Sequence, residues 1–215
     1  MVGHRLSAVG LVLTIMLYGC AGISGVESYV NKKYQSKSNS VNKLAIVPLT
    51  HLGPSLACTG KCPPLEQVTD ESFEKSFGEL SGKIFILPMV KTRVFFSTNT
   101  DLLKKLLDIT YSRQDLDNDP GLQKTLDGSE LASLRERLEG ADLLLVPARF
   151  DLVPQFGSIF GNSEFRLYDL HSGSLIYSSS EKINVNRSDE PGRGLTALVL
   201  ISKAKEAFEK FYLRQ

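Results

Sequence analysis

The sequence predicts an α/β fold: a single domain with a mixed parallel and antiparallel sheet of about five strands, flanked by helices. Three observations predict it. Short apolar runs in the first two thirds of the chain alternate with segments of helical period, as in parallel strands joined by helices. Two alternating segments around a glycine turn then predict an antiparallel hairpin. An amphipathic helix follows near the end of the chain.

Residues 1–19 have the organisation of an export signal. His4 and Arg5 give a positive start, and the apolar run Ala8 to Leu17 is shorter than the roughly 20 residues that a membrane-spanning helix needs. The run ends in Leu17-Tyr18-Gly19-Cys20, which resembles the lipobox of bacterial lipoproteins. This resemblance implies that Cys20 is acylated and becomes the first residue of the mature chain. An ordinary signal peptide with a chance cysteine is the alternative.

Lipidation of Cys20 would anchor the protein to a membrane, because several acyl chains on one residue hold it almost permanently. Ala21 rather than Asp follows the cysteine, which in lipoproteins of this kind implies the outer membrane, with the domain facing the periplasm. Residues 20–42 are expected to form a flexible tether, since the run from Asn31 to Ser40 has no apolar period. Fully stretched, this tether would reach roughly 70 Å.

The two other cysteines, Cys58 and Cys62, also fit an exported protein. The periplasm is oxidising, so we expect a disulfide between them, which would add roughly 2 kcal/mol of stability. His51 and both cysteines could instead supply three zinc ligands, but the sequence offers no clear fourth. A thioredoxin-type redox pair fits less well, because its cysteines are separated by two residues and these by three.

The charge balance argues against one class of partner. The chain of 215 residues has a formal net charge of +1 and no basic stripe, so nucleic acid is not an expected partner. The sequence indicates no cofactor, and no small-molecule substrate is expected.

The folded domain is predicted to cover residues 43–215. Leu44 to Leu49 is a short apolar run that predicts a buried strand, and a loop rich in Pro, Gly and Cys follows it. Residues Thr69 to Leu80 predict a helix that Thr69 caps and that carries its aromatic residues on one face. Ile84 to Leu87 predict the second strand.

The middle of the domain is predicted to be mainly helical. The apolar run Val94 to Phe96 is expected to continue the second strand or to add another, and Thr100 to cap a leucine-rich helix. The polar stretch Ser112 to Thr125 predicts a loop. Asp127 and Glu130 have the spacing of a capping box and mark the start of the next helix.

The last third of the chain predicts a strand, a hairpin and a helix. Leu143 to Val146 predict the third strand, and Pro147 indicates that this strand ends, bulges or lies at an edge. Glu164 to Tyr168 and Leu175 to Val185 alternate and predict the hairpin. Residues 197–211 predict the amphipathic helix that packs on the sheet.

Three short segments carry a family resemblance: the opening strand Leu44 to Leu49, the helix-to-strand junction Gly140 to Leu145, and the turn Asp169 to Gly173. They resemble the TolB amino-terminal-like domain, which also occurs in curli-secretion lipoproteins and in lipoprotein activators of penicillin-binding proteins. The likeness spans most of residues 43–213. It implies a non-enzymatic, protein-binding periplasmic module.

Patterns for catalysis and metal binding are weak. Ser72 and Lys75 match the Ser-x-x-Lys of penicillin-recognising enzymes, but the partner motifs are missing. Asp115, Asp117 and Asp119 alternate like the first ligands of a calcium loop, but the glycine and glutamate of an EF-hand loop do not follow, so a solvated loop fits better. We therefore expect neither enzymatic activity nor a metal site.

The segment Pro154 to Gly161 is the candidate partner site. It is expected to join two strands, and it carries Phe156, Ile159 and Phe160, which could dock a partner if exposed or fold back as a lid on the core. The sequence thus predicts a non-enzymatic accessory lipoprotein that binds an envelope protein. The alternative is a subunit of an oligomeric outer-membrane secretion or assembly complex. A membrane-spanning version would need hairpins of about 9–11 residues per strand, and we see no paired insertions of that size.

Overall fold

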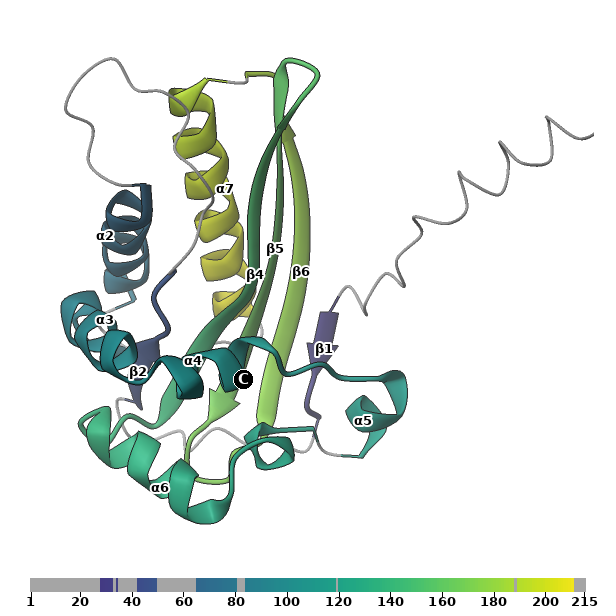
Figure 1. Cartoon of the computed structure of the whole chain (residues 1–215). Coiled ribbons are helices and arrows are strands. Elements are labelled where there is room, and N and C mark those ends of the chain that lie inside the picture. Colours follow the sequence, from purple (N-terminus) through teal and green to yellow (C-terminus); the bar gives the residue numbers. More distant parts are fainter. Residues whose placement is uncertain are drawn as a thin grey trace, which may run out of the picture.

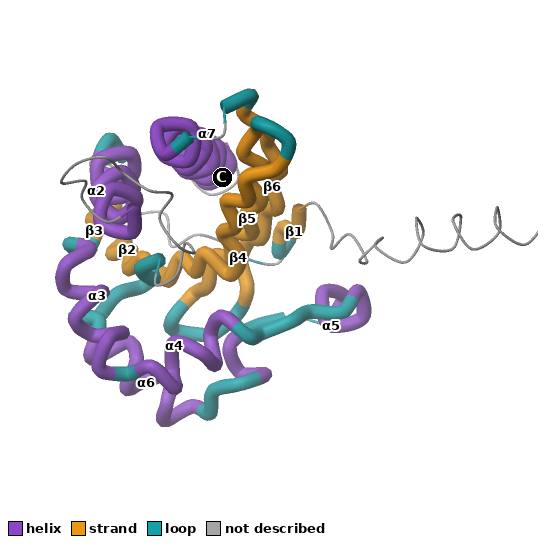
Figure 2. The backbone as a smooth tube through the Cα atoms, turned by 45° about the horizontal axis from the view of Figure 1, so that its top comes forward, coloured by secondary structure: helices purple, strands orange, loops and turns teal. Residues whose placement is uncertain are grey.

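A six-stranded sheet lies between two layers of helices (Figures 1 and 2). The computed structural model describes residues 28–32, 34, 42–49, 65–80, 84–118, 120–187 and 189–210. The elements are β1 (Ser28–Val30), β2 (Asn42–Ile46), α2 (Leu65–Gly78), β3 (Ile84–Ile86), α3 (Met89–Thr98), α4 (Thr100–Leu107), α5 (Arg113–Asp117), η1 (Leu122–Lys124), α6 (Gly128–Arg137), β4 (Leu143–Gln155), β5 (Ser158–Asp169), β6 (Leu175–Val185) and α7 (Glu190–Phe208).

The strand order is β1-β6-β5-β4-β2-β3. β2 pairs in parallel with β3 and β4, whereas β4, β5, β6 and β1 pair in antiparallel fashion. The predicted single α/β domain with a mixed sheet is therefore confirmed. The sheet has one strand more than the five expected, and the extra strand is β1.

β1 lies within the residues that we assigned to the tether, so the tether prediction is wrong for this part of the chain. Ser28 and Val30 pair with Ser179 and Tyr177 of β6, and the backbone N–H of Asn31 donates to the carbonyl oxygen of Ile176 at 2.9 Å. A strand of three residues has no apolar period to detect. Its order comes from hydrogen bonds to the edge of a sheet assembled by distant residues.

Each face of the sheet has its own core (Figure 2). On one face α2 and α7 contribute Phe73, Phe77 and Phe208, and the Phe73 ring lies 5.9 Å from that of Phe165 on β5. On the other face α3, α4 and α6 pack against β2, β4 and the turn between β5 and β6. The core on this second face includes Ala45, Phe96, Leu103, Leu106, Leu134, Leu144 and Tyr168.

Three helix predictions require correction. Thr100 is the first residue of α4, and Asn99 occupies the cap position before it. α2 begins at Leu65, and Thr69 lies inside it, where its hydroxyl donates to the carbonyl oxygen of Leu65 at 2.7 Å. Residues Val94 to Phe96 belong to α3 and not to a strand. A helix spreads three consecutive apolar residues over different faces, so Phe96 is buried while Val94 is 62% exposed.

The local signals around α6 are confirmed. Asp127 caps the helix and forms the expected capping box with Glu130. After the helix, Glu139 and Gly140 adopt positive φ angles of 54° and 73°, which end it. The polar stretch before α6 is more ordered than expected, because Ser112 and Asp115 form a second capping box that starts α5.

Candidate functional site

β4 continues well beyond the four residues predicted for it, and Pro147 marks where its surroundings change. The register with β5 shifts between Pro147 and Arg149, so the bulge is the correct one of the three alternatives. Residues 143–147 are all buried, whereas from Arg149 onward exposed or half-buried positions alternate with the buried Phe150 and Leu152. A strand covered on both faces thus becomes a strand covered on one face.

We call residues 149–155, 158–164 and 180–185 of β4, β5 and β6 the open half of the sheet. α7 lies along one face of these strands (Figure 1). It approaches β5 so closely that a Cβ atom at Gly161 would lie 2.6 Å from Thr196 Cγ2. None of the described elements forms a helical layer on the opposite face.

The uncovered side of the open half, here called the open face, carries cross-strand rows of side chains. They are Val153–Phe160–Asn184, Asp151–Asn162–Lys182 and Arg149–Glu164–Ser180. Val153 is 51% exposed and Phe160 is 40% exposed, and the two side chains are direct neighbours across the strands. The Arg149 Nε atom donates to Asp151 Oδ2 at 2.5 Å. The two opposite charges neutralise each other at the end of the open face nearest Pro147. The open face therefore combines an apolar strip with polar rows.

A two-residue turn, Phe156-Gly157, joins β4 to β5 and is called the apex here. Both residues have positive φ angles, 51° and 78°, as in the tight turns that favour Asn-Gly. Phe156 is 93% exposed, so no described side chain packs around its ring. Of the three predicted partner residues, Phe156 and Phe160 are exposed, whereas Ile159 is fully buried and belongs to the core. The alternation of β5 places it on the α7 side, which corrects that part of the prediction.

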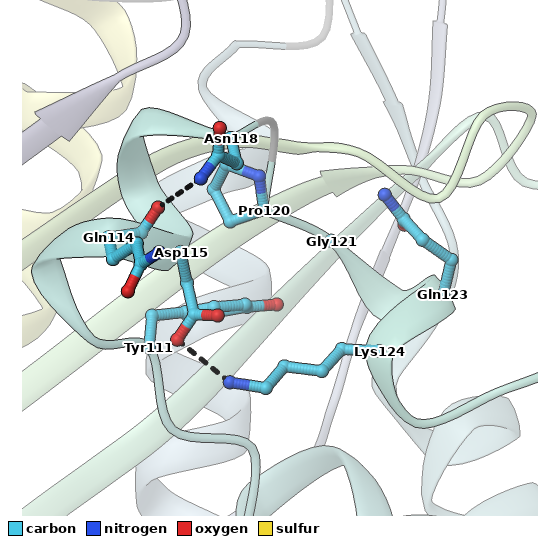
Figure 3. Close-up of a pocket in the computed structure, with 8 residues that line it drawn as sticks. All are labelled: Tyr111, Gln114, Asp115, Asn118, Pro120, Gly121, Gln123 and Lys124. Atoms are coloured by element: carbon cyan, nitrogen blue, oxygen red, sulfur yellow. Dashed lines mark hydrogen bonds and ion pairs between the residues drawn. The ribbon is translucent and has the colours of Figure 1, made fainter.

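A cavity of about 520 Å³ lies between α5 and η1 (Figure 3). Lys124 Nζ points across it and donates to Asp115 Oδ2 and to the Thr110 carbonyl oxygen, both at 2.9 Å. Hydrogen bonds from Lys124, and then from Ser112, lower the pKa of Asp115 to about 2. Burial raises the pKa of Tyr111, whose hydroxyl meets that of Tyr168 at 3.2 Å. The polar groups of this wall thus bond to one another, which favours a structural role.

Arg166 marks the border between this region and the open face. It is buried, and its Nε atom donates to Glu164 Oε1 at 2.7 Å. Its guanidinium also lies 5.3 Å from the centre of the Tyr111 ring and donates to the carbonyl oxygen of Ile109. The side chain therefore fixes the segment before α5 against the sheet.

The other residues considered for chemistry have structural contacts. The Ser72 hydroxyl donates to the carbonyl oxygen of Val68 within its own helix, at 2.6 Å. His171 Nε2 lies 2.9 Å from Asp142 Oδ1, and Asp142 also accepts from the backbone N–H of Lys43. Asp142 therefore ties the start of β2 to the turn between β5 and β6.

Several predicted residues lie outside the described part of the chain: Cys20, Cys58, Cys62, His51 and Asp119. Their lipidation, disulfide and ligand assignments remain predictions. Among the residues that the structure does describe, no three His, Cys, Asp or Glu side chains come close enough to hold a metal ion. The helices described are all too short or too polar to cross a membrane.

No protein-family model and no curated protein matches the chain. Similar solved structures include the PelC dodecamer from Paraburkholderia phytofirmans, with 15% identity, a TM-score of 0.36, and coverage of 76% of this chain and 84% of that chain. Lipoprotein GNA1162 from Neisseria meningitidis has 14% identity, a TM-score of 0.41, and coverage of 77% and 99%. TolB from Acinetobacter baumannii has 9% identity, a TM-score of 0.31, and coverage of 77% and 29%.

TolB, the protein whose amino-terminal domain the sequence motifs resemble, is thus among the solved structures similar to this chain. At these identities and TM-scores the similarities assign neither a family nor a function to the chain.

The open face and the cavity are the parts of the site that sequence reasoning missed. A signal for the open face exists, because the residues after Pro147 change from a continuous apolar run to alternation. The cavity gives no such signal, since it forms within a polar stretch interpreted as a loop.

Proposed function

We propose that this protein is a non-enzymatic accessory lipoprotein of the cell envelope. Acylated Cys20 anchors it to the outer membrane, and the open face binds an envelope protein in the periplasm. Cell-wall enzymes and assembly machines of the envelope are the class of partner that such an anchored module would recruit or regulate.

The proposal rests on one observation: α7 covers one face of the open half, and the opposite face is exposed. α7 buries Phe150, Leu152 and Ile159 on one side, while the other side presents Val153 and Phe160 to solvent. A contiguous exposed surface of apolar and polar rows is typical of a docking site. The side chains stand on paired strands, so their positions are set before a partner arrives.

Two experiments test the proposal. Mass spectrometry of the protein purified from its native membrane should find the chain starting at Cys20 with acyl groups attached. Photo-crosslinking in intact cells should then give a discrete protein adduct when a photoreactive residue replaces Lys182 on the open face. Leu198 on the outer side of α7 is the matched control position, because it is exposed to 45%. An unmodified amino terminus, or the same adducts from both positions, contradicts the proposal.

A further inference from the structure

We infer that the apex of the β4–β5 hairpin contacts the surface of the membrane that holds the lipid anchor. The inference rests on the proposed acylation of Cys20 and specifies how the domain stands on the bilayer. Its occupant is the lipid surface, and the contact residue is Phe156 at the apex, while Val153 and Phe160 remain part of the open face.

The first argument is the direction in which the chain leaves the domain. Ser28 pairs with Ser179 and Val30 with Tyr177, and β6 runs from these residues toward the apex. β1 therefore starts at its end nearer the apex (Figure 1). The residues that precede Ser28 therefore join β1 at the end that is nearer to the apex.

The second argument is reach. Because β1 is paired to the sheet, only the eight residue steps from Cys20 to Ser28 (28 − 20) separate the lipid from the domain. Eight steps span at most about 28 Å. Val185, which pairs with Ile159 beside the apex, lies six residues beyond Ser179, or about 20 Å along the strand. The Phe156-Gly157 turn lies about two residues beyond Ile159, roughly 7 Å farther, so the lipid and the apex meet one bilayer when residues 20–28 are almost fully extended.

The third argument is the composition of the hairpin end. From Leu152 to Ser163 the chain carries no charged side chain, and residues 183–186 of the neighbouring strand and the turn after it carry none either. Charged groups would oppose entry into the interface between headgroups and acyl chains, whereas aromatic rings favour it. Lys182 on β6 and Arg187 after it are the first charged residues on either side of residues 183–186, and Arg187 is ion-paired with Asp189.

The fourth argument is the backbone of the apex. Phe156 has a left-handed conformation that a bulky residue adopts at a cost, and its exposed ring gains no packing among the described residues that would offset the cost. Such strain at an exposed position points to a contact outside the chain. The apex is too small for a specific protein interface, which uses roughly 20–30 residues a side. It suffices as a second contact beside the lipid anchor, because it has only to orient a domain that the acyl chains already hold at the bilayer.

The chain contains no tryptophan, so a single introduced indole can report on its surroundings. The test uses the full mature protein with its native amino terminus, reconstituted into vesicles of phosphatidylethanolamine and phosphatidylglycerol with brominated acyl chains. The Phe156→Trp variant should show blue-shifted emission that the bromines quench. The matched control is Val90→Trp, which should remain unquenched. Val90 is exposed to 65% and belongs to α3, a helix that lies away from the apex in Figure 1.

Equal quenching of both variants, or none in the Phe156→Trp variant, would overturn the inference. Emission from that variant that is shifted only in whole envelopes, and not in protein-free vesicles, would assign the apex to a protein partner instead. Mass spectrometry of the same sample separates the two proposals. If Cys20 is acylated and the indole is unquenched, only the orientation fails. If Cys20 is unmodified, both proposals fail.

Discussion

The two halves of the long strands share their hydrogen bonds but differ in their surroundings. In residues 143–147, β4 is buried on both faces, by α2 and α7 on one side and by α3, α4 and α6 on the other. In residues 149–155, the same strand is covered on one face only. The bulge after Pro147 separates the two environments and brings Phe150 and Leu152 back to the α7 side. The covered half is therefore expected to contribute more to stability, whereas the open half presents an accessible surface.

The largest expected effect is in the covered half. Leu144 of β4 is fully buried beneath α3, α4 and α6. Leu144→Ala should therefore lower the free energy of unfolding by about 2–5 kcal/mol. Val153→Ala is the matched change in the open half and should alter it by about 0.5 kcal/mol or less. Urea unfolding of both variants measures the contrast. Equal losses would show that the two halves are not energetically distinct.

The next effect tests how tightly α7 packs on the open half. Gly161→Ala would place a methyl group against Thr196 Cγ2 and Ile183 Cγ1, which should cost about 1–3 kcal/mol. Adding Thr196→Ser removes the first of these methyl groups and should recover part of the loss. Gly194→Ala, also on α7 but facing open space, should instead stabilise the helix by up to about 1 kcal/mol. Thermal or urea unfolding distinguishes these outcomes, and no rescue by Thr196→Ser would contradict the packing argument.

A smaller effect concerns Asp142, at the covered end of the sheet. Burial alone would raise the pKa of its carboxyl group, but the Lys43 N–H and His171 outweigh burial and lower it. A lowered pKa in the folded state means that the stabilisation is present above the ordinary Asp pKa near 4 and is lost as the pH falls through the folded value.

Asp142→Asn should therefore reduce stability by about 1 kcal/mol at pH 7 and by less at pH 3. Urea unfolding at both pH values measures this difference. Asp117→Asn, at an exposed position of α5, controls for the loss of a carboxylate. A penalty for Asp142→Asn that stays the same at pH 3 would show that its charge is not the cause.

The smallest effect has the opposite sign and lies at the apex. Asn is favoured over Phe at the first position of this turn, so Phe156→Asn should stabilise the free protein by up to about 1 kcal/mol. Phe156→Ala, which removes the ring but keeps a side chain that disfavours positive φ, should give no such gain. Unfolding of the lipid-free domain compares the two, and destabilisation by Phe156→Asn would mean that the ring has a structural contact.

Residues with strong local signals were predicted well. The capping box of Asp127 and Glu130, the hairpin of β5 and β6 and the helix near the carboxyl end depend on neighbours in sequence, so their patterns are visible there. Most of the sheet follows from the same patterns. β1 could not be predicted, because its order comes from an edge formed by residues about 150 positions later.

The candidate site was predicted only in part. The segment around Phe156 and Phe160 was identified as a candidate, either exposed or folded back on the core. The strand period that buries Ile159 becomes apparent only once β5 is known to start at Ser158. The open face depends on which strands α7 covers and which it leaves bare. Tertiary packing determines which strands α7 covers. Gly161 is one indication of it in the sequence, because glycine allows the close approach of α7.

The pairing of β1 also determines how the domain resists mechanical force. A force that pulls Ser28 toward the apex acts along the axis of β1, and therefore along the axis of its antiparallel neighbour β6. All the hydrogen bonds between the two strands then share the load in shear, and none is peeled away before the others. Tension applied to β1 therefore passes to its neighbour β6 through all three paired residues at once.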